Sequence, residues 1–109
     1  METKRIIDLD KLKLLKEDNV NDWIKFGAKV EKMLYYMFAP SGVSMAKFYL
    51  KGNNKDIDLF LTALGSEKKY MDAFLRNGLN DPSVLRSRYA LERAVGRFEL
   101  QTGIKWPLK

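Results

Sequence analysis

Apolar residues recur at intervals of three and four along most of this chain, and this spacing is the feature that most constrains its fold. Strict alternation of apolar and polar residues, which is typical of half-buried strands, is nearly absent. The spacing therefore predicts the all-α class, as a compact single-domain bundle of four to six helices with a long C-terminal helix. The clearest stripe of apolar residues covers about a third of a helix circumference and consists of Trp23, Phe26, Val30, Leu34 and Met37.

The chain is short enough that one hydrophobic core is the default, so residues 1–109 are expected to form one domain. Residues 1–7 and 104–109 are interpreted as terminal segments. Ile104 and Trp106 in the second segment are costly to leave in water, so we expect that segment to pack back on the bundle.

The first segment, residues 6–16, is ambiguous between helix and strand. We expect a short helix after Asp8 or Asp10, although a short strand fits the same residues. The ambiguity arises from the alternating positions Ile7, Leu9, Leu12 and Leu14.

The next two elements are both expected to be helical. One helix is predicted to begin at an Asn21 cap and to end before Pro40, because proline disfavours helical geometry in the residue preceding it. A short helix over residues 43–50 is expected to follow, closed by Gly52 in a left-handed cap.

A further helix is predicted from Asp56, and Asn53 and Asn54 before it offer the N-cap. Gly65-Ser66 marks either a break between two helices or a kink in one. The clearest boundary follows it. Gly78 suits a helix end, and Asp81 followed by proline suits an N-cap and a first helical position. The final helix is expected over residues 83–102, with Gly103 as its stop.

The composition excludes several kinds of chemistry. No cysteine or histidine is present, so disulfides, thiolate nucleophiles and imidazole acid–base catalysis are excluded, and serine lacks its usual base. Asn54, Asp56 and Asp58 have the first spacings of a calcium loop, but Leu59 replaces the required glycine, so helix capping explains Asn54 and Asp56 better. We expect a protein that is not an enzyme, with no catalytic residue, no metal and no cofactor.

The N-terminal residues turn polar before an apolar stretch of signal-peptide length develops. The longest nearly uncharged apolar run, residues 33–40, is far shorter than the roughly 18 residues needed to span a bilayer. We therefore expect an intracellular protein, cytoplasmic or nuclear, without a membrane partner.

Twenty Lys and Arg residues against fourteen Asp and Glu residues give a net charge of +6, which favours an anionic partner. Arg86, Arg93 and Arg97 fall within about 40° on a helical wheel and are flanked by Tyr89 and Leu100. Such a row suits successive phosphates, and the tyrosine suits stacking on a base. We therefore predict a nucleic-acid-binding site there, and its simpler interpretation is a solvated helix face.

Lys25, Lys29 and Lys32 form a second basic stripe, which would enlarge the site if the two helices packed with contiguous outer faces. A helix-turn-helix around Gly78 fits the same region, since an arginine-bearing helix follows that turn. The alternative is an ordinary antiparallel helix pair.

Aromatic residues support a different function, a protein-interaction or assembly module that is basic only for solubility. Several of them cannot all face one core, and an exposed group of them would mark a protein interface or a self-association surface. The simpler interpretation is that the short helix carrying two of them is buried on most sides. The candidate interface residues are Tyr36, Phe48, Tyr49 and Trp106.

Overall fold

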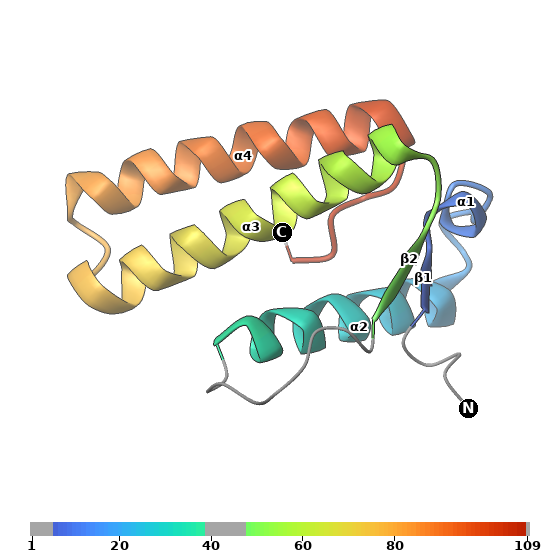
Figure 1. Ribbon diagram of the computed structural model, residues 1–109, viewed down its shortest axis with the longest axis horizontal. Helices are drawn as coiled ribbons and strands as arrows, with labels where there is room; N and C mark the ends of the chain where they lie inside the picture. Colours follow the sequence, from blue (N-terminus) through green and yellow to red (C-terminus); the bar gives the residue numbers. More distant parts are fainter. Residues whose placement is uncertain (1–5, 39–47, 109) are drawn as a thin grey trace.

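The computed structural model describes residues 6–38 and 48–108 as a compact, mostly helical molecule with a long C-terminal helix (Figure 1). Two long helices form an antiparallel hairpin, a third crosses beside it, and a small strand pair lies at one end. The described elements are, in chain order, β1 (Ile6–Asp8), α1 (Leu9–Leu12), α2 (Val20–Phe38), β2 (Tyr49–Lys51), α3 (Asn54–Asn77) and α4 (Pro82–Thr102).

The strand pair corrects the all-α prediction. β1 and β2 are parallel, with Ile7 opposite Leu50, and parallel strands need a long crossover, which α2 supplies. The helix expected over residues 43–50 is wrong at Tyr49 and Leu50, which are extended, and its first five residues lie outside the described part. Gly52 is not a helix cap either, since it follows β2. A Cβ at this position would lie 3.1 Å from Leu9 Cβ, so glycine allows the backbone to approach Leu9 closely.

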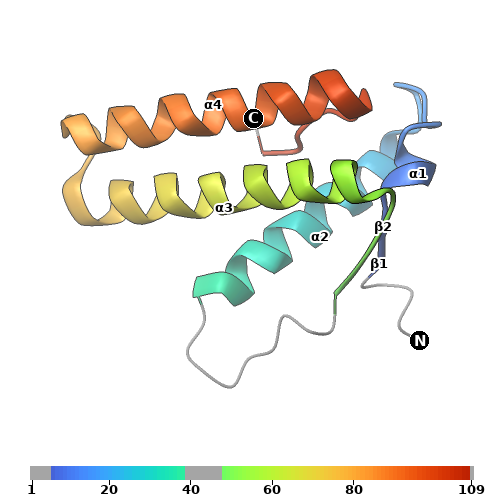
Figure 2. The ribbon, with the colours of Figure 1, turned by 45° about the horizontal axis from the view of Figure 1, so that its top comes forward.

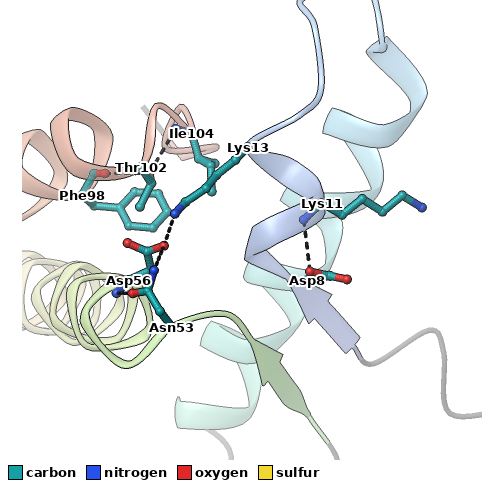
Figure 3. Close-up of polar contacts among 8 residues, drawn as sticks. All are labelled: Asp8, Lys11, Lys13, Asn53, Asp56, Phe98, Thr102 and Ile104. Carbon is teal, nitrogen blue, oxygen red and sulfur yellow. Dashed lines mark hydrogen bonds and ion pairs between the residues drawn. The ribbon is translucent and has the colours of Figure 1, made fainter.

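The ambiguous first segment contains both of the structures considered for it. β1 gives way at once to α1, whose N-cap is Asp8, one of the two expected starts. The Asp8 carboxylate accepts a hydrogen bond from the Lys11 backbone N–H at 3.1 Å (Figure 3). Ile7 and Leu9 are both buried, so this short segment contributes directly to the core.

α2 and α3 differ in detail from their predicted forms. α2 begins at Val20, so Asn21 lies inside the helix rather than capping it. α3 runs unbroken through Gly65-Ser66, which rules out two separate helices there. Its N-cap is Asn53, whose side-chain oxygen accepts from the Asp56 backbone N–H at 2.8 Å. The cap is therefore one of the two asparagines, Asn53 and Asn54, that the sequence offers as N-cap, while Asp56 lies in the first turn of the helix.

The hairpin turn and α4 match the predicted boundaries. Asp81 caps α4 by accepting from the Ser83 backbone N–H at 2.8 Å, and Pro82 occupies the first helical position. Gly103 ends the helix with φ of +75°, a left-handed conformation that favours glycine, and its N–H donates to the Glu99 carbonyl at 2.8 Å.

The C-terminal tail lies against the helices instead of extending into solvent (Figure 1). Ile104 and Trp106 are buried, and the Trp106 ring lies 5.7 Å from the Phe60 ring and 5.6 Å from the Phe98 ring. Trp106 Nε1 donates to a Glu67 carboxylate oxygen at 2.9 Å. The tail therefore completes the core between α3 and α4.

Candidate nucleic-acid interface

The outer face of α4 is the candidate site, and α3 and the tail determine which face that is. The face of α4 toward α3 and the tail is buried at Val84, Val95 and Phe98. In two views of the molecule α4 lies along one edge, with no element covering its other side (Figures 1 and 2). Residues about half a helix circumference from the buried face are therefore open to solvent.

Five side chains form a continuous row on this open face, spaced three, four, four and three residues apart, as a helix requires. At about 1.5 Å per residue the row extends over roughly 21 Å. All five are exposed, including the tyrosine at 63% and the leucine at 90%. We call these residues the α4 row: Arg86, Tyr89, Arg93, Arg97 and Leu100.

The other arginines of the α3–α4 hairpin, Arg76 and Arg88, are in ion pairs. Arg76 Nε lies 3.5 Å from an Asp72 carboxylate oxygen, and Arg88 Nε lies 3.5 Å from Glu92. Within the described part of the chain, Arg93 and Arg97 form no ion pair.

Arg93 and Arg97 are themselves one turn apart, and like charges at this spacing destabilise a helix by about 0.2–0.5 kcal/mol. No acidic residue lies three or four positions from either arginine. Helix stability therefore does not account for these two charges, and both guanidinium groups remain available to an external anion.

Arg86 lies at the start of the row, near the hairpin turn. Hydrogen bonds from the Ser83 side chain and backbone lower the pKa of Asp81, and the positive charge of Arg86 lowers it slightly further. Arg86 therefore has one carboxylate in electrostatic range.

The lysines of α2 do not extend the α4 row, because α3 lies between α2 and α4 (Figures 1 and 2). Lys25 and Lys29 instead line a cleft of about 370 Å³ against the β1–α1 segment, together with Lys11. Lys29 Nζ donates to the Ile6 carbonyl at 2.8 Å. Burial lowers the pKa of Lys29, and the charges of Lys25 and Lys11 lower it further. Part of this stripe is therefore engaged within the molecule.

The third lysine of that stripe, Lys32, is exposed but does not line the cleft. Two carboxylates, Asp8 and Asp22, line the cleft beside the lysines, so its charge is mixed. The two basic stripes therefore do not form one groove, and the α4 row is the more uniform of the two.

The helix-turn-helix interpretation is wrong. The helices of that motif cross at about 90–120°, with the second free to enter a groove. α3 and α4 instead run side by side in opposite directions along their whole length (Figures 1 and 2). This is the antiparallel pair that was the alternative.

The aromatic candidates divide between surface and core. The Tyr36 ring lies 5.9 Å from the Phe48 ring and 5.7 Å from the Tyr35 ring, and both Tyr36 and Phe48 are half-buried. Tyr49 is 57% exposed. Trp106 is only 3% exposed, so it is a core residue and not the surface anchor that the protein-interaction hypothesis needs.

An apolar groove between α2 and the C-terminal tail was not anticipated from the sequence. It has a volume of about 710 Å³, and its lining includes Trp23, Gly27 and Pro107. On the α2 side, Val20 and Ile24 are 56% and 63% exposed, one helical turn apart. Both lie away from the core stripe on a helical wheel, so the wheel contained a signal for this surface.

Two carboxylates are buried, which no pattern in the sequence indicates. Asp56 is fully buried and forms an ion pair with Lys13, joining the end of α1 to the start of α3 (Figure 3). Glu67 is 7% exposed, and burial raises its pKa while the hydrogen bond from Trp106 partly opposes this. Because these contacts join distant segments of the chain, both carboxylates have a structural role.

Within residues 6–38 and 48–108, no group of three or more acidic side chains is arranged to hold a metal ion. None of the helices formed by those residues combines the length and apolar character required to cross a bilayer. Comparisons with protein-family models, curated proteins and solved structures found no match.

Proposed function

We propose that the protein is a non-catalytic binding module that holds nucleic acid through phosphate contacts to the α4 row. The observation that carries this proposal is that Arg93 and Arg97 lie one turn apart on an open helix face and form no ion pair with any residue of the described segments. Guanidinium groups bind phosphate in a bidentate geometry, and a rigid helix keeps their spacing constant. Arg86 extends the same contact toward the hairpin turn.

The net charge of +6 supports the proposal independently of the row. A basic protein attracts a polyanion at long range, and phosphate contacts then release condensed counterions. Affinity for nucleic acid should therefore fall steeply between about 50 and 200 mM salt.

The direct test reverses the charge of the row. Binding of a fluorescently labelled oligonucleotide is measured by anisotropy for the wild type and for the triple variant Arg86→Glu, Arg93→Glu, Arg97→Glu. We expect the variant to lose at least about 100-fold in affinity at low salt, since three phosphate contacts become repulsive.

The matched control reverses three exposed lysines outside the row, Lys16→Glu, Lys55→Glu and Lys69→Glu, with the same change in net charge. If binding depends on the row, the control loses much less affinity than the arginine variant. Equal losses would show that net charge alone drives binding. A wild type that binds neither DNA nor RNA would contradict the proposal outright.

A second candidate is a protein-interaction or assembly module, which the apolar groove beside α2 favours. Val20 and Ile24 expose apolar surface next to an apolar groove, the arrangement found at protein interfaces. Association through this surface would be nearly indifferent to salt and would be weakened by Ile24→Glu. Leu75→Glu, at a 72% exposed leucine on α3, is the control. Analytical ultracentrifugation over a range of protein concentrations measures the self-association of both variants.

A further inference from the structure

We infer that the ligand of the α4 row is a single strand of nucleic acid, with one base stacked on Tyr89. This inference rests on the proposed function and specifies the form of nucleic acid that the row binds. It follows from the open position of the row on α4 and from the residues that share the row with the arginines.

The first argument is geometric. The α4 row lies on the face of α4 opposite α3 and the C-terminal tail, so a ligand can reach all five of its side chains (Figure 2). The bases of a duplex are stacked on one another, so their faces are closed to the Tyr89 ring unless a nucleotide is flipped out at a cost of a few kcal/mol. An unpaired base offers its face to the ring without that cost.

The second argument is chemical. Tyr89 lies one turn from Arg86 and one turn from Arg93, so its ring stands between two phosphate-binding groups on the same face. It is 63% exposed and makes no ring contact with the described residues of the chain. An open aromatic ring between cationic groups is the arrangement by which proteins hold single strands, with bases on rings and phosphates on charges.

The C-terminal end of the row also has an exposed apolar side chain. Leu100 follows Arg97 by three residues and is 90% exposed, which adds an apolar surface beyond the last guanidinium. In a duplex the apolar contacts open to a side chain are few and consist chiefly of the thymine methyl groups in the major groove. The sugar and the exposed base face of an unpaired nucleotide offer a larger apolar surface.

The test compares three probes at one salt concentration: a single-stranded oligonucleotide of about 15 nucleotides, a duplex of the same sequence, and inorganic polyphosphate, which has no bases. We expect the wild type to prefer the single strand to the duplex. Tyr89→Ala should weaken single-strand binding by about five- to 100-fold and leave polyphosphate binding unchanged. Tyr89→Phe should retain most of the affinity, because the ring remains.

Tyr35→Ala serves as the control, since Tyr35 is 69% exposed on α2, away from the row. Equal affinity for single strand and duplex, or full single-strand affinity in Tyr89→Ala, would overturn the inference. If the Arg93→Ala, Arg97→Ala double variant still lost affinity in that case, the proposed function would stand without this inference. If that double variant also bound normally, the proposed function itself would fail.

Discussion

Replacing Trp106 with phenylalanine tests how the C-terminal tail is held. Trp106 is 3% exposed, and its ring contacts those of Phe60 and Phe98. Its Nε1 donates to Glu67 at 2.9 Å. Phenylalanine keeps an aromatic ring among the same neighbours but removes the donor, leaving a buried carboxylate without that partner.

The expected cost follows from these contacts. A hydrogen bond to a charged group contributes about 1.5–3 kcal/mol, and the smaller ring leaves a space that costs roughly 1 kcal/mol more. Trp106→Phe should therefore lower the free energy of unfolding by about 2–4 kcal/mol at pH 7. Urea unfolding monitored by far-ultraviolet circular dichroism measures this without relying on tryptophan fluorescence.

The cost should also depend on pH. Burial raises the pKa of Glu67 above its ordinary value of 4.5, so the folded protein binds this proton before the unfolded chain does. The stability contributed by this group is fully present below the ordinary value and is lost as pH rises through the raised pKa. Once Glu67 is neutral, its bond to Trp106 contributes only about 0.5–1.5 kcal/mol.

The loss caused by Trp106→Phe should therefore be smaller at pH 4 than at pH 7, by roughly 1 kcal/mol. A loss below about 0.5 kcal/mol at pH 7, or the same loss at both pH values, would refute this account of the tail.

Three further predictions concern stability and are each measured by urea unfolding. Glu67→Gln should raise the free energy of unfolding at pH 7 and weaken its pH dependence, because the amide is neutral and still accepts from Trp106. Asp56→Ala should cost about 3 kcal/mol, because it leaves Lys13 partly buried without its partner. Gly103→Ala should lower the free energy of unfolding by about 1 kcal/mol, because Gly103 has a left-handed φ that alanine disfavours. Gly96→Ala should raise the free energy of unfolding by about 0.5–1 kcal/mol, because Gly96 lies inside α4 with open space around it.

The parts of the fold that could be predicted from the sequence depend on local signals. Asp81, Pro82 and Gly103 mark the ends of α4 through hydrogen bonds within a few residues, so their meaning does not depend on the rest of the chain. The strand pair could not be predicted in this way. β1 and β2 have three residues each, and what makes them strands is their pairing across the whole of α2.

The same distinction applies to the candidate site. A helical wheel places Arg86, Arg93 and Arg97 on one face, since that arrangement belongs to a single helix. It says nothing about whether the lysines of α2 lie nearby, because that depends on helix packing. Trp106 failed as a surface candidate for a related reason. Its short tail has no periodicity, and its burial depends on contacts with Phe60 and Glu67 on α3, far along the chain.

The measurement that tests the central claim most directly is the salt dependence of single-strand affinity in two matched double variants. One removes the unpaired arginines, Arg93→Ala with Arg97→Ala, and the other removes the paired ones, Arg76→Ala with Arg88→Ala. Each phosphate contact contributes about 0.7 to the slope of log affinity against log salt, so the first variant should flatten the slope by about 1.4. The second should leave the slope unchanged. Equal slopes in the two variants would contradict the assignment of the α4 row as the nucleic-acid site.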